Sequence, residues 1–144
     1  MARTIQDVIA GHKPIVGHRN MLVREACKIM GAAKVSSLMV MDGDHLEGIF
    51  TERDALLKVL VDSLDPDKTK LEEVMVRNPQ TVRAEQSMAY ALLVMVEGGF
   101  RHVPVVDNEG KVVGMISARD AMGEDVVRLE RELERRETLE NPRS

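Results

Sequence analysis

One stretch of this 144-residue chain occurs twice. Gly48 to Ala55 reads Gly-Ile-Phe-Thr-Glu-Arg-Asp-Ala, and Gly114 to Ala121 reads Gly-Met-Ile-Ser-Ala-Arg-Asp-Ala. Asp54 and Asp120 therefore lie 66 positions apart, and apolar residues keep this offset without a gap over most of the chain. A period of this length, present only twice, predicts two similar subdomains packed together rather than a long repeat array.

The composition indicates a globular protein and argues against several other classes. With 44% hydrophobic and 31% charged residues, the chain is long enough to bury one good core, which we expect the two halves to share. The net charge of −4, without any Lys- or Arg-rich block, argues against binding to a nucleic-acid backbone. The aromatic content of 2% leaves few side chains on which bases could stack.

Cellular location and metal binding are constrained by what the sequence lacks. No apolar run approaches the ~20 residues of a membrane span, and the first residues lack a signal-peptide core, so we expect a cytoplasmic protein. The single cysteine, Cys27, falls at a helical position, where we expect a reduced, packed thiol. The four histidines show no paired metal-ligand spacing, and we expect no metal site.

Each half shows the same order of periodicities. Apolar residues recur at helical spacing over residues 22–33 and 88–99, which predicts one amphipathic helix in each half. Each helix is followed by two short apolar runs joined by a turn that contains Asp and Gly, a pattern typical of a β-hairpin. We expect a second helix after each hairpin, beginning near Thr51 and Ser117.

These patterns divide the chain into four parts. The first repeat covers 5–60, a polar linker covers 61–70, the second repeat covers 71–125, and a charged helix and tail cover 126–144. The charged helix carries only a narrow apolar stripe, so it is either a solvated terminal helix or a dimer contact.

A specific family resemblance rests on the repeated motif. An apolar strand, Gly, two apolar residues and then Ser/Thr-x-x-Asp, present twice at this spacing, is similar to a tandem pair of cystathionine-β-synthase (CBS) domains. The segment Arg101 to Asp107, Arg-His-Val-Pro-Val-Val-Asp, adds to the resemblance, which covers about residues 5–125. It implies an α/β (α+β) fold in which two β-α-β-β-α repeats pack with pseudo-two-fold symmetry. The rest is too short for a catalytic or transport domain, so the chain resembles a stand-alone CBS-pair protein.

The resemblance implies a nucleotide site around each Ser/Thr-x-x-Asp motif. It places Asp54 and Asp120 on ribose hydroxyls, and Thr51 and Ser117 on ribose or phosphate. Read directly, the same motifs are also capping boxes that begin helices, and a helix N-terminus with free N–H groups attracts anions. Both interpretations stay open from the residues alone.

Further cations and apolar residues complete the expected site. Arg53 and Arg119 precede the two aspartates, and Arg101 with His102 resembles positions that contact phosphate in adenylate-binding CBS pairs. Unless residues cross between the halves, the site of Asp120 then has more cations than the site of Asp54. For the base, the segments Pro14-Ile15-Val16 and Gln80-Thr81-Val82, at the first strand of each repeat, either line an adenine slot or are plain core strands. Val16, Thr81 and Val82 are the candidates we select from them.

These residues predict a regulatory sensor of adenine nucleotides and not an enzyme. AMP, ADP or ATP is the expected ligand, with S-adenosylmethionine or NAD(H) as alternatives, and no cofactor is required. The competing hypothesis is a ligand-indifferent dimerisation scaffold in which the motifs only cap helices. We expect a homodimer whose contacts use the apolar helices after Thr51 and Ser117.

Overall fold

The computed structural model describes residues 2–140 of the chain, so the tail from residue 141 lies outside the described residues. The first half contains α1 (Ile5–Ile9), β1 (Val16–Gly17), α2 (Val23–Ala33), β2 (Ser37–Asp42), β3 (His45–Thr51), α3 (Glu52–Asp54) and a π-helical continuation, η1 (Ala55–Leu60). The second half contains α4 (Leu71–Val74), β4 (Val76–Arg77), β5 (Val82–Arg83), α5 (Met88–Gly98), β6 (His102–Val106), β7 (Val112–Ser117), a 3₁₀ turn η2 (Ala118–Asp120) and α6 (Gly123–Glu140).

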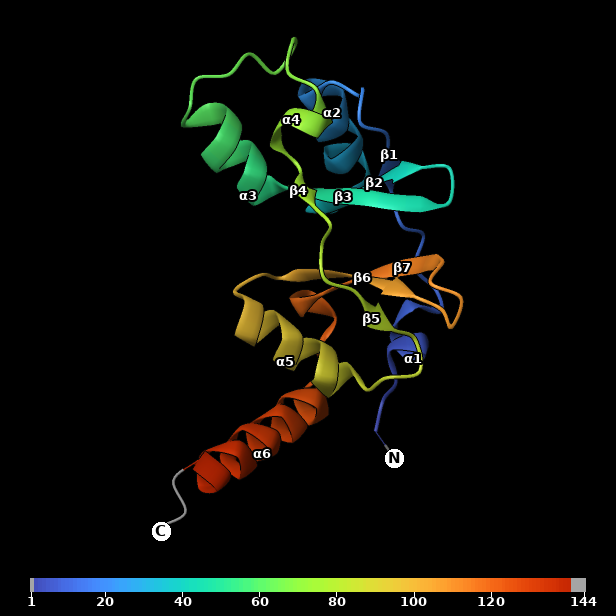
Figure 1. Cartoon of the computed structure of the whole chain (residues 1–144), viewed down its shortest axis with the longest axis vertical. Helices are drawn as coiled ribbons and strands as arrows, with labels where there is room; N and C mark the ends of the chain where they lie inside the picture. Colours follow the sequence, from blue (N-terminus) through green and yellow to red (C-terminus); the bar gives the residue numbers. More distant parts are fainter. Residues whose placement is uncertain (1, 141–144) are drawn as a thin grey trace.

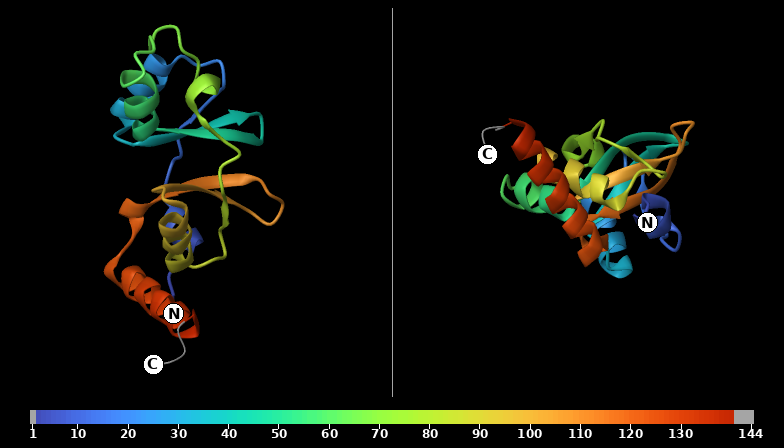
Figure 2. Two further views of the ribbon diagram at one scale, coloured as in Figure 1. Left: turned by 60° about the vertical axis from the view of Figure 1, so that its left-hand side comes forward. Right: turned by 90° about the horizontal axis from the view of Figure 1, so that it is seen from below.

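The strands form two sheets, which lie one above the other with helices on their outer sides (Figures 1 and 2). One sheet has the order β1-β2-β3-β4 and the other the order β5-β6-β7. In each, the first strand is parallel to the next, and an antiparallel hairpin follows. This mixed architecture of two similar halves confirms the predicted fold class.

Two clusters of buried residues replace the single shared core that we expected. Each cluster takes a short helix from the other half of the sequence. Ile5 and Val8 of α1 are buried in the cluster of the second half, and Leu71 and Val74 of α4 are buried in the cluster of the first half. The halves are therefore held together by exchanged helices, with apolar burial worth about 1.5–3 kcal/mol for each such side chain.

The linker has a structural role at the start of α2. No side chain caps this helix, whose first N–H groups would otherwise lack acceptors. The amides of Val23 and Arg24 donate to the carbonyls of Thr69 and Pro66, at 2.9 and 3.0 Å. The linker thus binds to the first half as a cap. In the second half, Ser87 caps α5 through its side chain.

The two halves differ after their hairpins, and here one prediction was wrong. The helix after Thr51 continues through Leu60, but after Ser117 only the turn η2 forms, and Ala121 is extended. A new helix, α6, begins at Gly123 and slants away from the body (Figure 1). Its start is fixed by Asp125, which is 1% exposed and pairs with Arg3 at 2.7 Å.

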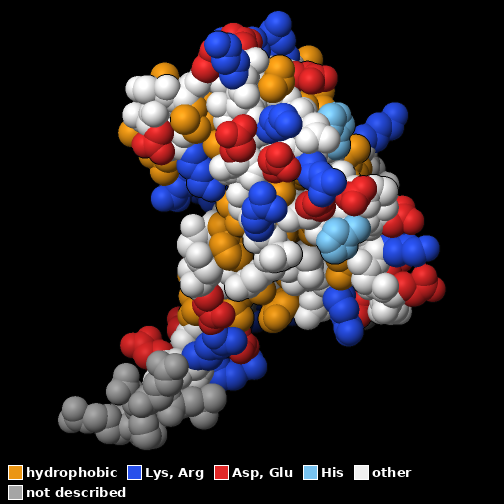
Figure 3. Space-filling model, turned by 45° about the horizontal axis from the view of Figure 1, so that its top comes forward, with side chains coloured by type: hydrophobic (Ala, Val, Ile, Leu, Met, Phe, Trp, Pro, Cys, Tyr) orange, Lys and Arg blue, Asp and Glu red, His pale blue; other side chains and the backbone are white. Residues whose placement is uncertain are grey.

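Two further observations concern the surface. Cys27 is exposed rather than packed, which corrects the sequence-based expectation, although partial burial raises the pKa of its thiol. Within residues 2–140, no helix is both long and apolar enough to cross a membrane. Basic and acidic side chains are interspersed on the face shown in Figure 3.

Candidate functional site

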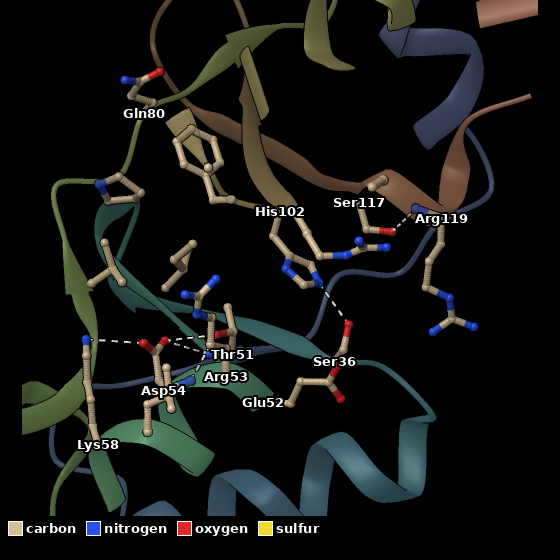
Figure 4. A pocket seen from close by; sticks show the side chains of 18 residues that line it. Ser36, Thr51, Glu52, Arg53, Asp54, Lys58, Gln80, His102, Ser117 and Arg119 are labelled. Atoms are coloured by element: carbon tan, nitrogen blue, oxygen red, sulfur yellow. Dashed lines mark hydrogen bonds and ion pairs between the residues drawn. The ribbon is translucent and has the colours of Figure 1, made fainter. Parts of the chain in front are cut away.

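A cleft of about 600 Å³ lies between the two halves, on the side where α3 lies. We call it the Asp54 cleft. Its walls include the end of β3 with α3 and η1, β4 and the chain after it, the segment that leads into β6, and the end of β7 with η2. Figure 4 shows side chains from both halves pointing toward one another across it. A volume in this range fits a small-molecule ligand.

Asp54 lines this cleft, and its side chain is only 8% exposed. Its Oδ2 accepts hydrogen bonds from the amide and the hydroxyl of Thr51, both at 3.0 Å. Its Oδ1 lies 3.2 Å from Nζ of Lys58. Because an ionised carboxylate offers about four acceptor positions, these partners leave about one open for a hydroxyl donor.

Basic side chains outnumber acidic ones around Asp54. Arg53 and Lys58 come from the first half, whereas Arg101 and Arg119 come from the second; the acidic residues in the cleft are Glu52 and Asp54. The cleft is therefore suited to a ligand that carries negative charge.

One part of the Asp54 cleft is apolar. This part consists of Ile49, Leu57, Val76, Pro79 and Phe100, with Gln80 beside them. Aliphatic contacts and one aromatic ring can cover the faces of a flat heterocycle, and nearby amides can orient its edge. The cleft thus combines an anion-attracting part with an apolar part.

A second, smaller cleft of about 410 Å³ surrounds Asp120. We call it the Asp120 cleft. Oδ2 of Asp120 accepts a hydrogen bond from the amide of Ser117 at 2.8 Å, and its Oδ1 lies 3.9 Å from Nε2 of His12. The carboxylate is 24% exposed, and Lys13 and Lys34 also line this cleft. Asp120 therefore has fewer fixed partners than Asp54.

His102 lies between the two clefts and lines both. Its Nε2 is 2.8 Å from Oγ of Ser36, a residue of the first half (Figure 4). Burial lowers the pKa of the imidazole below its ordinary value; the charge of Glu52 raises this pKa, and that of Arg101 lowers it. The charges of Asp120 and Arg119 act weakly, in the raising and the lowering direction.

The structure brings together most, but not all, of the residues that the sequence singled out. Thr51, Arg53, Asp54, Arg101, His102, Ser117 and Arg119 line the Asp54 cleft, and His102, Ser117, Arg119 and Asp120 line the Asp120 cleft. Arg101 thus crosses to the motif of the other half, which contradicts its expected grouping with Asp120. The expected surplus of cations at Asp120 is also wrong, because three Lys and Arg side chains line that cleft and four line the Asp54 cleft.

Of the residues proposed for the base, Pro14, Ile15 and Gln80 line the clefts, whereas Val16, Thr81 and Val82 line neither. Val82 is 2% exposed and belongs to the core of the second half, whereas Val16 is 52% exposed and Thr81 is exposed. Pro14 and Ile15 lie in the Asp120 cleft, and Gln80 lies in the Asp54 cleft together with Pro79, which the sequence did not single out. For Val82 the reason is that a strand residue that faces the core cannot also face the cleft.

Lys58 and Phe100 are cleft residues that the sequence analysis missed. Lys58 follows Asp54 by four positions on a helix, a spacing that favours an ion pair and was a usable signal. Phe100 carried no such signal, because its direction is set by Gly99, which follows α5 and adopts a left-handed conformation. Among the described residues, no group of three or more His, Cys, Asp and Glu side chains is placed to hold a metal ion.

Comparison with known proteins agrees with this architecture. The model of the CBS domain family matches residues 5–61 and 71–126, so the chain belongs to the CBS domain family and carries two such domains in tandem. A relative, the CBS domain-containing protein CBSCBSPB5 of Arabidopsis thaliana, is 37% identical over 112 residues, which is 77% of this chain. The chain spans only about 20% of that protein's length.

Two solved structures with small-molecule ligands share the fold. The CBS domain pair of protein MJ0100, in complex with 5′-methylthioadenosine and S-adenosyl-L-methionine, is 29% identical with a TM-score of 0.73, over 90% of this chain and 96% of that one. The CBS domain protein PAE2072 from Pyrobaculum aerophilum, complexed with AMP, is 21% identical with a TM-score of 0.79, over 88% and 98% of the two chains. At that identity the second likeness concerns the fold alone. CBS pairs of this kind are regulatory ligand-binding modules.

Proposed function

We propose that this CBS pair is a regulatory module that binds an adenine nucleotide, AMP, ADP or ATP, in the Asp54 cleft. The observation that carries the proposal is the combination within one cleft. A buried carboxylate, four basic side chains and an apolar wall face one space formed by both halves. A nucleotide needs all three: an acceptor for ribose, cations for phosphate and an apolar surface for the base.

In this proposal Asp54 accepts one ribose hydroxyl at the acceptor position that its protein partners leave open. Arg53 and Arg101 bind the phosphate, since a guanidinium matches phosphate oxygens in a bidentate manner. The base lies against Val76 and Phe100. A nucleotide held this way contacts both halves, so its binding free energy depends on how the halves are arranged, which is what a sensor needs.

Charge favours a nucleotide over the alternative ligand S-adenosylmethionine. That molecule carries a sulfonium cation and an ammonium group besides its carboxylate, whereas the side chains of the cleft include four basic and two acidic groups. The basic side chains of the cleft repel the sulfonium cation at short range, whereas they attract the anionic phosphate of AMP. NAD(H), which carries two phosphates, remains compatible with this charge but needs room for a second nucleoside.

The scaffold hypothesis explains part of the structure. Both motifs do form capping boxes, as Thr51 with Asp54 and Ser117 with Asp120. Capping, however, does not require Arg101, which belongs to the other half and reaches the cleft from the segment before β6. We therefore favour ligand binding over a purely structural role, and we propose no catalytic activity.

The test is calorimetry and thermal melting of the purified protein with AMP, ADP, ATP, S-adenosylmethionine and NADH. We expect the adenylates to bind, and a ligand at 100 times its dissociation constant to stabilise the folded state by about 2.7 kcal/mol. Asp54→Asn should weaken binding, whereas Asp44→Asn, a change on the exposed hairpin turn, should not. A melting temperature that none of the five ligands shifts would leave the scaffold hypothesis.

A further inference from the structure

The hydrogen bond between Ser36 and His102 joins equivalent positions of the two repeats. The two residues are 66 positions apart, which is the offset of the internal repeat, and Oγ of Ser36 lies 2.8 Å from Nε2 of His102. In a pair of pseudo-symmetric halves, equivalent side chains touch only near the axis that relates the halves. The contact therefore marks this axis, at the centre of the molecule.

The same contact separates the two clefts. Ser36, His102, Ser117 and Arg119 line the Asp54 cleft and also the Asp120 cleft. Arg119 is exposed, whereas Ser36 and His102 are half-buried. A half-buried side chain that forms part of two cavities cannot change its charge or hydrogen bonding for one ligand without changing the other cavity.

We infer that His102, held by Ser36, couples the occupancy of the two clefts, so that an anionic ligand in one favours an anionic ligand in the other. The inference rests on the proposed function, because it takes phosphate as the anionic group. Phosphate in either cleft attracts a proton to His102. The second phosphate then binds next to an imidazolium that is already charged. The free-energy cost of protonating His102 has been offset by the binding of the first phosphate, so the second binds more tightly.

The surroundings of His102 favour its neutral form in the free protein. Burial lowers the imidazole pKa in the free protein, and Arg101 and Arg119 lower it further, while Glu52 and Asp120 act in the opposite direction. A nearby phosphate adds negative charge and raises the same pKa. Coupling through one proton is then largest between these two pKa values, because at lower pH His102 is already charged and at higher pH it stays neutral.

The hydrogen bond between Ser36 and His102 connects the charge of His102 to the first half. A neutral imidazole nitrogen can accept a hydrogen bond from the serine hydroxyl, whereas an imidazolium nitrogen can only donate. When His102 becomes charged, Oγ of Ser36 must accept, and its own proton is free to turn toward a ligand. The charge change on β6 is thereby transmitted to the segment before β2 in the other half.

The experiment is calorimetric titration of AMP into four proteins between about pH 5 and pH 8, the range in which histidine changes charge. These are the wild type, His102→Gln, Ser36→Ala and the control His45→Gln, whose side chain is exposed and lies outside both clefts. We expect two AMP molecules to bind to the wild type, with the second about fivefold tighter than independent sites allow at the optimal pH. Because the AMP phosphate itself titrates near pH 6, the comparison with His102→Gln isolates the imidazole.

His102→Gln and Ser36→Ala should abolish the coupling, and His45→Gln should retain it. Independent sites in the wild type, a single bound AMP, or coupling that persists in His102→Gln would overturn the inference, while the proposed function, which needs one occupied cleft, would stand. If no nucleotide binds, the proposed function fails. NMR titration of the His102 imidazole with inorganic phosphate then decides the inference separately, and an unchanged imidazole titration overturns it.

Discussion

The position of Arg101 leads to a prediction about which motif it assists. The arginine belongs to the second repeat, yet it lines the cleft of Asp54 and not that of Asp120. If it binds phosphate there, Arg101→Ala should weaken AMP binding only in the Asp54 cleft. A charge-assisted hydrogen bond contributes about 1.5–3 kcal/mol, and because Arg101 is exposed we expect the lower end, which is about a tenfold loss of affinity.

A double-mutant cycle measures this assignment by calorimetry. Arg101→Ala is combined with Asp54→Ala and, separately, with Asp120→Ala. With the Asp120 cleft disabled, the tenfold loss should persist, whereas with the Asp54 cleft disabled, Arg101→Ala should change the remaining affinity by less than about twofold. Lys34→Ala is the matched control, because Lys34 lines only the Asp120 cleft, and it should show the opposite dependence.

The assignment is refuted if the loss of AMP affinity caused by Arg101→Ala persists in the Asp54→Ala background and disappears in the Asp120→Ala background. Arg101 would then bind ligand in the Asp120 cleft. Asp54 also caps α3 and pairs with Lys58, so its removal affects folding as well as binding. A melting curve of each ligand-free variant therefore accompanies the cycle, and Asp54→Asn, which retains a carbonyl acceptor for the Thr51 amide, replaces Asp54→Ala if the latter unfolds.

Two further predictions concern stability and assembly. Arg3→Ala should lower the free energy of unfolding, measured in urea, by about 1–3 kcal/mol, because it leaves the buried carboxylate of Asp125 without its cation. The control Arg83→Ala, which removes a surface ion pair, should lower it by less than about 1 kcal/mol. Equal losses in the two variants would contradict the reasoning. Light scattering should give about twice the chain mass of 16.1 kDa, because η1 exposes an apolar face. Leu60→Lys, at a side chain 71% exposed, should produce a monomer, whereas a monomer from Leu133→Lys instead would move the contact to α6.

Local periodicity predicted the secondary structure of the repeats well. The helical pattern over 22–33 corresponds to α2 at Val23–Ala33, and that over 88–99 corresponds to α5 at Met88–Gly98. Such patterns succeed because the alternation of apolar and polar residues reflects which face of one element is buried. They do not state which other element covers that face. The exchange of α1 and α4 between the halves was therefore not predicted, although both helices lie within the repeats.

The candidate site was predicted as a set of residues but not as an arrangement. The internal repeat shows which positions are equivalent, such as Ser36 and His102, but equivalence does not imply distance. Only a pseudo-two-fold axis that passes close to a pair brings its members into contact, and this axis is a property of the packed halves. For the same reason, the sequence did not show that Arg101 lines the Asp54 cleft, and we grouped it with Asp120 of its own repeat instead.

The inequality of the two clefts has its origin in the residues that follow the two motifs. After Asp54 the apolar sequence Ala55-Leu56-Leu57 continues the helix, so that Leu57 and Lys58 reach into the Asp54 cleft. The equivalent positions in the second repeat are Gly123 and Glu124, where α6 begins in a new direction. Asp120 consequently has no lysine partner of this kind and is the more exposed carboxylate, at 24% against 8% for Asp54. Three differences in the four residues that follow a repeated motif thus give one cleft a buried, nearly saturated carboxylate and the other an open one, and two sites built on the same motif need not bind the same ligand with the same affinity.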